Sequence, residues 1–182
     1  MIKFLVCGDV KYPQRNFGDA GIDLYVPNYS DEFRTKLLLD NDVYDCFENE
    51  LGERHDINIT ADKICLQPGA DIKISTMVRA LIPVDECLRF SNKSGVALKQ
   101  KLIVGAEIID SSYEGIMNIH VFNVSNETRF IDFGQKIVQA VPIKIDNDLI
   151  CVGSDKDISV EEFYKNHNHS RGEGGFGSTG IK

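Results

Sequence analysis

The residues best suited to chemistry lie in a glycine-rich run near the C-terminus. Residues 171–180 read Arg-Gly-Glu-Gly-Gly-Phe-Gly-Ser-Thr-Gly. Backbone N–H groups without neighbouring side chains can approach a phosphate closely, Arg171 adds a planar cation, and Phe176 adds a ring on which a base can stack. With the hydroxyl groups of Ser178 and Thr179, this combination suits a nucleotide. Taken alone, the run is also typical of a disordered tail, because it cannot build a core.

Four more motifs precede this run, and each combines glycines or turn-forming residues with polar side chains. They are Ala20-Gly21-Ile22-Asp23-Leu24, Asn92-Lys93-Ser94-Gly95-Val96-Ala97-Leu98-Lys99, Gly105-Ala106-Glu107-Ile108-Ile109-Asp110-Ser111-Ser112-Tyr113-Glu114-Gly115 and Gly134-Gln135-Lys136-Ile137-Val138-Gln139. In this order the five motifs resemble those of the trimeric dUTP pyrophosphatases. The resemblance covers residues 20–27 and about 63–180. One such motif is weak evidence, whereas five in the family's order are specific.

The resemblance implies a dUTP diphosphatase, which converts dUTP and water to dUMP and pyrophosphate. In the third motif, Asp110 would be the general base that activates water for attack on the α-phosphorus. Tyr113 would lie against the deoxyribose and leave no room for a 2′-hydroxyl. The backbone of Gly105, Ile108 and Ile109 would read the edge of the uracil. Outside such a motif, a carboxylate in a turn is more often a turn former and an aromatic ring is more often part of the core.

The resemblance also implies how the phosphates are held. Lys93, Ser94 and Gly95 would contact phosphate, and Gln139 would support the catalytic water. Mg²⁺ would bridge phosphate oxygens and keep several waters, and Asp23 is the nearest candidate to hold those waters, although a structural hydrogen bond is the alternative for this carboxylate. The arm residues that would close over the γ-phosphate and the uracil are Arg171, Phe176, Gly177, Ser178 and Thr179.

A homotrimer with shared active sites follows from the same resemblance, because the third motif, the group of first, second and fourth motifs, and the arm come from different chains. Three positions depart from the family's pattern. Lys93 and Lys136 stand where arginine is usual, and a lysine offers a point charge rather than a planar fork. Glu107 stands where glycine is common, and we expect its carboxylate to point away from the uracil hairpin.

Composition narrows the remaining possibilities. The 182 residues carry a net charge of −8, so no general electrostatic attraction draws the chain to nucleic acid or to an anionic membrane. No run approaches the ~18 apolar residues of a membrane span. The five cysteines are odd in number and contain no Cys-x-x-Cys pair, which favours neither a disulfide framework nor a zinc site. We expect a cytoplasmic protein, in the host cytoplasm if it is viral.

Most of the chain is predicted to form short strands. Residues 72–78 and 137–145 alternate with a period of two, and residues 116–124 are β-branched and apolar as in a central strand. No long helical pattern separates these runs, so the sheets should be antiparallel, in a sandwich or barrel. The resemblance narrows this all-β prediction to a distorted β-barrel or jelly roll. We expect one domain over residues 1–165, followed by a flexible arm over 166–182.

An acidic block over residues 28–62 has no counterpart in the family. It holds ten acidic and three basic residues, a net charge of −7. Ser30 is a candidate N-cap with two acids after it, and Val43, Phe47 and Leu51 recur every four residues, which predicts two short helices. A solvated surface excursion is the simplest interpretation of this insert. The alternative is a docking surface for a protein partner.

Two further functions compete with dUTP hydrolysis. A dCTP deaminase would share the fold, but that family uses a different acid and base set and lacks the glycine-rich arm. A nucleotide-sensing module would use the insert 28–62 to bind a partner and dUTP as its signal. Pyrophosphate release from dUTP, dCTP, dTTP and UTP with Mg²⁺ discriminates between these hypotheses.

Overall fold

The computed structural model describes residues 1–42, 56–148, 154, 156 and 158–165. Strands dominate these residues, as the alternating sequence pattern predicts. The elements are β1 (Lys3–Val6), β2 (Ile22–Tyr25), α1 (Asp31–Asp40), β3 (Ile57–Ile59), β4 (Lys63–Leu66), β5 (Asp71–Ser75), β6 (Val78–Leu81), β7 (Glu86–Asn92), the π-helical turn η1 (Val96–Gln100), β8 (Leu102–Val104), β9 (Ile108–Ile109), β10 (Asn118–Asn123), β11 (Arg129–Asp132), β12 (Lys136–Lys144) and α2 (Val160–Phe163).

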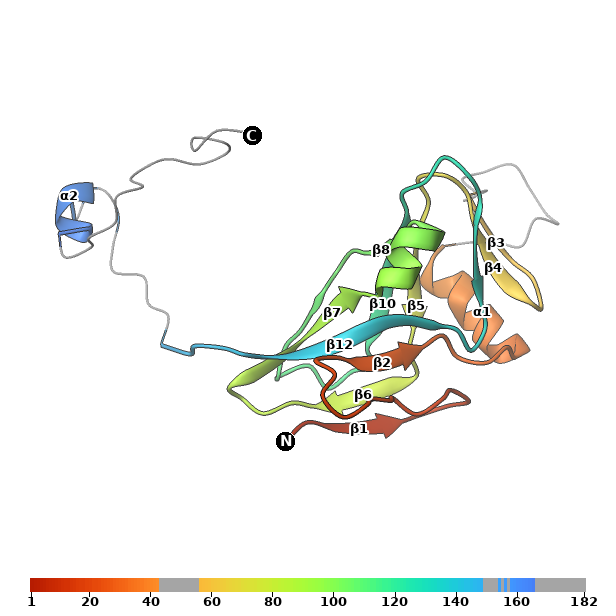
Figure 1. The fold of residues 1–182 in the computed structure, drawn as a ribbon, viewed down its shortest axis with the longest axis horizontal. Coiled ribbons are helices and arrows are strands. Elements are labelled where there is room, and N and C mark those ends of the chain that lie inside the picture. Colours follow the sequence, from red (N-terminus) through yellow and green to blue (C-terminus); the bar gives the residue numbers. More distant parts are fainter. Residues whose placement is uncertain (43–55, 149–153, 155, 157, 166–182) are drawn as a thin grey trace. The chain divides into compact units, whose positions relative to one another are not determined.

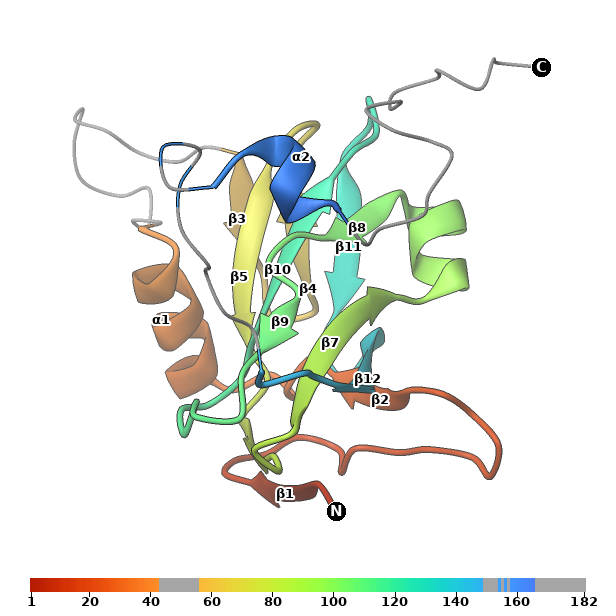
Figure 2. The same cartoon turned by 90° about the vertical axis from the view of Figure 1, so that its left-hand side faces the viewer.

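The strands pair into small antiparallel sheets. Their orders are β2-β12-β7-β9, β5-β10-β8, β11-β4-β3 and β1-β6, and every pairing among them is antiparallel. Figures 1 and 2 show the strands of the first three sheets arranged around a common interior. This confirms the expectation of antiparallel β structure.

Two of the three expected strands are confirmed, and the third ends early. Strand β12 covers most of 137–145, and β10 lies between β5 and β8 as a central strand. The run 72–78 is not one strand, because β5 stops at Ser75 and Met77 takes a positive φ of 54°. The Thr76 hydroxyl accepts the N–H of Val78 and stabilises this turn, which leads into β6. Alternation alone does not reveal such a turn.

The first helix of the insert begins where the sequence predicts. The Ser30 hydroxyl accepts the N–H of Phe33 at 3.0 Å and caps α1. Phe33 and Leu37 face the interior, with Leu37 only 1% exposed. At the C-terminal end, the buried Asn41 amide accepts the N–H of Lys73 and donates to its carbonyl, which ties α1 to the edge of β5. Figure 2 shows α1 beside β5.

The second predicted helix, with Val43, Phe47 and Leu51, lies outside the described residues.

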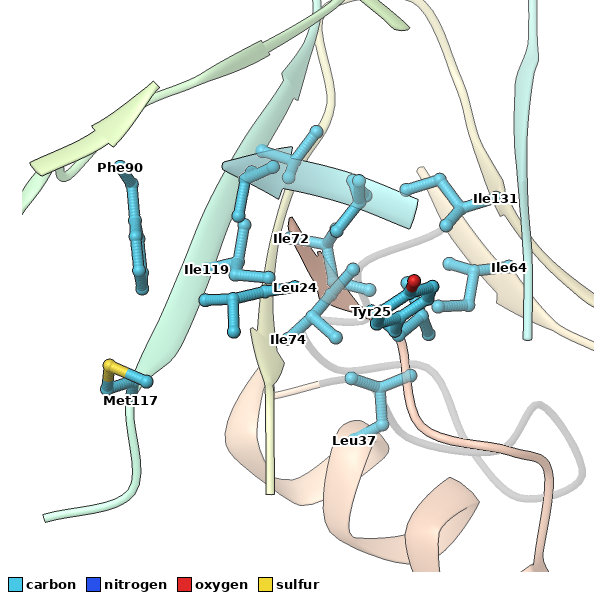
Figure 3. Packing of buried hydrophobic residues seen from close by; sticks show 14 of the residues in the cluster. Leu24, Tyr25, Leu37, Ile64, Ile72, Ile74, Phe90, Met117, Ile119 and Ile131 are labelled. Carbon is cyan, nitrogen blue, oxygen red and sulfur yellow. The ribbon is translucent and has the colours of Figure 1, made fainter. Parts of the chain in front are cut away.

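The core is a single cluster of aliphatic and aromatic side chains. Figure 3 shows side chains from the strands and from α1 meeting in it. The labelled members are Leu24, Tyr25, Leu37, Ile64, Ile72, Ile74, Phe90, Met117, Ile119 and Ile131. Because Leu24 and Phe90 are buried in β2 and β7, the neighbouring polar residues of those strands are held at fixed positions.

The chain divides into two compact units, Met1–Asp146 and Asn147–Lys182. The expected boundary at residue 165 stays a prediction. Among the described residues, Cys7, Cys65 and Cys87 are free thiols, and no described helix is both long and apolar enough to span a membrane.

Candidate functional site

One cavity gathers the expected phosphate-binding residues. It has a volume of about 520 Å³ and lies where β7 runs into η1, beside β12. Its walls are Lys93, Ser94, Gly95, Val96, Lys99, Gln100, Asp132, Gln135 and Gln139. Four of the predicted site residues, Lys93, Ser94, Gly95 and Gln139, therefore meet in one place.

Asp23 joins two lysines at the side of this cavity. Its Oδ1 accepts a hydrogen bond from the Lys93 ammonium at 2.5 Å, and its Oδ2 accepts one from the Lys136 ammonium at 2.9 Å. The carboxylate is only 18% exposed. Burial alone would raise the pKa of Asp23, but the hydrogen bonds from Lys93 and Lys136 outweigh it and hold the pKa below its usual value. The same contact with Asp23 raises the pKa of Lys136.

Gly21 makes room for Gln139. Gly21 immediately precedes β2, and Gln139 lies on the neighbouring strand β12, opposite Asp23. A Cβ at position 21 would stand 2.8 Å from Gln139 Oε1 and 2.9 Å from its Cβ. Only glycine lets the amide lie there, where it lines the cavity and donates to the Asn92 carbonyl at 3.3 Å.

The third motif forms a second, smaller cavity of about 180 Å³. Its walls are Ile108, Ile109, Asp110, Tyr113 and Asn118. Asp110 opens a turn in which the N–H of Tyr113 donates to the Asp110 carbonyl at 3.1 Å, as the sequence Asp-Ser-Ser predicts. The Asp110 carboxylate is exposed and, within the described part of the chain, makes no ion pair or hydrogen bond. The Tyr113 hydroxyl donates to the Ile116 carbonyl at 2.9 Å.

The segment that the sequence predicts to read the base is held from both sides. The N–H of Gly105 donates to the His120 carbonyl at 2.9 Å, and β9 pairs with Leu88 and Arg89 of β7. Glu107 does not line the second cavity. Its carboxylate accepts the Arg89 guanidinium at 2.8 Å on β7. The departure from glycine therefore adds an ion pair between this segment and β7, and the expectation that the Glu107 carboxylate points away from the uracil hairpin stays a prediction.

The two cavities have no lining residue in common. Ile109 pairs with Leu88, the third residue of β7, and Lys93 follows the last residue of that strand. Four residues of extended strand lie between Leu88 and Lys93, so the Cα atoms of these two residues are roughly 16 Å apart. Asp110 and Lys93 of one chain therefore line separate cavities.

Some predicted site residues lie outside the described part of the chain, and some residues that line the cavities were not predicted from the sequence. Arg171, Phe176, Gly177, Ser178 and Thr179 lie outside the described residues. Asp132 and Asn118 line the cavities without a sequence signal of their own, because the fold brings them there. Lys99, Gln100 and Gln135 lie within or beside the quoted motifs, and their positions at the turns next to Gly95 and Gly134 could have indicated them.

Within the described ranges, no three His, Cys, Asp or Glu side chains come together as ligands for a metal ion. Both oxygens of Asp23 are held by ammonium groups. A direct protein cage for Mg²⁺ is therefore not formed by these residues. An ion that arrives on phosphate oxygens with its own waters still fits, since Mg²⁺ in proteins is commonly held that way.

Comparison with known proteins decides the family. The sequence model of the dUTPase family matches residues 55–180. The chain belongs to the dUTPase family. This dUTPase chain is 30% identical over 157 residues to the deoxyuridine 5′-triphosphate nucleotidohydrolase of Solanum lycopersicum, with 82% of each protein covered. It is 38% identical over 107 residues to the Candida albicans enzyme of the same name, covering 59% of this chain and 62% of that protein.

The fold of this dUTPase chain is also found in a solved structure. The Staphylococcus bacteriophage 80alpha dUTPase, solved with dUpNHpp, superposes with a TM-score of 0.68 at 21% identity. The match covers 100% of this chain and 99% of the phage protein. The expected dUTPase-type jelly roll is therefore confirmed.

Proposed function

We propose that this chain is a dUTP diphosphatase that hydrolyses dUTP to dUMP and pyrophosphate. The observation that carries the proposal is the pair of cavities built from the family's own motifs. One holds Lys93, Ser94 and Gly95 in a polar cradle, and the other holds an exposed carboxylate, Asp110, beside an aromatic ring, Tyr113. Membership of the dUTPase family supports the same substrate.

Asp110 is the general base of the proposed reaction. Within the described residues its carboxylate has no ion pair or hydrogen bond, so it is available to accept a proton from water. The water oxygen then forms a bond to the α-phosphorus, and the bond from that phosphorus to the oxygen bridging to the β-phosphate breaks. Pyrophosphate leaves with the electron pair of that bond, and dUMP remains.

The phosphate cradle supplies positive charge where the protein as a whole is negative. Lys93 and Lys99 line the larger cavity together with Ser94 and Gly95. Mg²⁺, when bound, would neutralise charge on the phosphate oxygens. Asp23 would accept hydrogen bonds from the waters of that ion once a lysine turns from Asp23 to the substrate.

Complete sites would be shared between chains in a homotrimer. The separation of the two cavities supports this, since the proposed base Asp110 and the proposed phosphate contact Lys93 line different cavities of one chain. One chain would contribute Asp110 and Tyr113, another would contribute Lys93, Ser94, Gly95 and Gln139, and the arm with Arg171 and Phe176 would close the site.

Pyrophosphate release with a panel of nucleotides tests the function. The protein is mixed with dUTP, dCTP, dTTP and UTP under Mg²⁺, and its mass is measured in solution. We expect release from dUTP far above the other three, from a trimer. Ammonia released from dCTP would identify a deaminase instead, and a fully active monomer would refute the shared site.

A further inference from the structure

Gly115 lies directly against the ring of Tyr113. An ideal Cβ at position 115 would overlap the Tyr113 hydroxyl oxygen. It would stand 2.5 Å from the Cζ and 3.0 Å from the Cε2 of the same ring. Ordinary contacts of a Cβ begin at 3.4 Å. Any side chain at position 115 must therefore push the ring away.

Backbone conformation is not the reason for glycine here. The glycines with positive φ are Gly18, Gly69 and Gly134 among the described residues, and Gly115 is not one of them. Alanine could adopt the same backbone without strain. Apart from the two chain neighbours, the three atoms nearest to an added Cβ all belong to Tyr113, so this ring is the first group that a side chain at position 115 would displace.

The ring is held at both ends of a short loop. The Tyr113 N–H donates to the Asp110 carbonyl at 3.1 Å, and the Tyr113 hydroxyl donates to the Ile116 carbonyl at 2.9 Å. The hydroxyl contact crosses over Gly115. The same loop therefore fixes the Tyr113 ring and the first residue of the turn, Asp110, in one unit beside the smaller cavity.

We infer that Gly115 is a specificity-determining residue, which positions the Tyr113 ring so that it excludes a 2′-hydroxyl. This inference rests on the proposed function, in which Tyr113 faces the deoxyribose. Gly115 acts through Tyr113 and touches no substrate. Its missing Cβ fixes how close the ring can come to the sugar.

The substitution Gly115→Ala should move the Tyr113 ring without disturbing the fold. Tyr113 is 41% exposed, so its ring can move into solvent without opening the core. Relief of the clash at Cζ requires a movement of about 1 Å, and misplacement of a positioning group by this distance can cost about 100-fold in rate. We expect the ratio of kcat/KM for dUTP to that for UTP to fall by roughly 10- to 100-fold.

Two controls isolate the ring. Glu114→Ala changes an exposed side chain in the same loop and should leave the dUTP to UTP ratio unchanged. In a Tyr113→Ala background, Gly115→Ala should cause no further change in the ratio, because the ring that it displaces is gone. Partial unfolding would lower activity on both nucleotides equally, so a fall in the ratio cannot come from it, and the ratio is compared for variants that keep the wild-type melting temperature.

A readout without substrate completes the test. In protein labelled with ¹³C-tyrosine, the Tyr113 ring signal is assigned by its absence from Tyr113→Ala, and it should shift in Gly115→Ala but not in Glu114→Ala. An unshifted ring signal overturns the inference, as does an unchanged nucleotide ratio or an equal loss in the Tyr113→Ala background. Failure of the wild type to release pyrophosphate from dUTP would instead refute the proposed function, while the ring signal still reports on Gly115.

Discussion

The surroundings of the two cavities of this chain are built in opposite ways. On the phosphate side, which holds the proposed phosphate contacts, Asp23 forms ion pairs with Lys93 and Lys136. On the hairpin side, the Asp110 carboxylate has no partner among the described residues, and the backbone turn sets its place. The charged groups on the phosphate side are thus paired with one another, whereas the proposed general base is left free to accept a proton.

Among the tests of this contrast, Asp110→Asn should have the largest effect on the turnover of dUTP. The amide keeps the shape of the side chain but cannot accept a proton, so turnover of dUTP should fall by more than about 10²-fold while the nucleotide still binds. Steady-state rates and binding of a non-hydrolysable dUTP analogue check this. Asp62→Asn, which changes an exposed carboxylate outside both cavities, is the matched control. If Asp110→Asn turns over dUTP near the wild-type rate, Asp110 is not the general base.

Removal of the arm before Arg171 comes next. The arm would bring Arg171 and Phe176 to the ligand and exclude water, so the truncated protein should lose most of its turnover and keep its melting temperature. Rates and thermal melting are measured on both proteins. If the truncated chain hydrolyses dUTP as well as the full one, the run 171–180 is only a tail.

Asp23→Asn tests the phosphate side. Loss of a charged hydrogen bond costs about 1.5 kcal/mol, which corresponds to roughly tenfold in KM. We expect KM for dUTP to rise with a smaller change in kcat, because Lys93 loses its fixed position. A change confined to kcat would instead connect Asp23 with the reaction step.

The same variant gives a pH test with a definite sign. Because contact with the lysines lowers the pKa of Asp23 in the folded protein, the stabilisation is present above the ordinary pKa of about 3.9 and is lost as the pH falls through the lowered value. The free energies of unfolding of the wild type and Asp23→Asn should therefore differ at neutral pH and converge at low pH. A difference that grows on acidification would contradict this assignment.

Leu37→Ala should have the smallest effect on turnover. Leu37 is buried in the core and belongs to none of the five motifs, so its truncation should lower stability by about 2–5 kcal/mol and leave kcat/KM unchanged. Leu39→Ala, on the exposed side of the same helix, is the control. A folded Leu37→Ala protein with impaired turnover would connect the insert with the active site.

The sequence predicts the turns at the two cavities better than it predicts how distant segments of the chain meet. Turn formers and glycines mark Asp110, Gly95 and Gly134 in the chain, and local backbone preference is enough to place them in turns. The Asp23 clamp was not predicted, because it joins strands β2 and β12 with the residue after β7 through side-chain reach. The turn at Met77 was missed because its positive φ is stabilised by Thr76 and not by a glycine. Contacts between distant segments depend on the whole fold, which no local pattern encodes.

The Asn41 side chain has a consequence for the behaviour of the protein in a crowded cell. Strand β5 is the outer strand of its sheet, and an open outer strand can recruit a strand from another molecule and start aggregation. The Asn41 amide occupies both the N–H and the carbonyl of Lys73, as a neighbouring strand would. Helix α1, through Asn41, therefore keeps this part of the edge of β5 from pairing with a strand of another molecule.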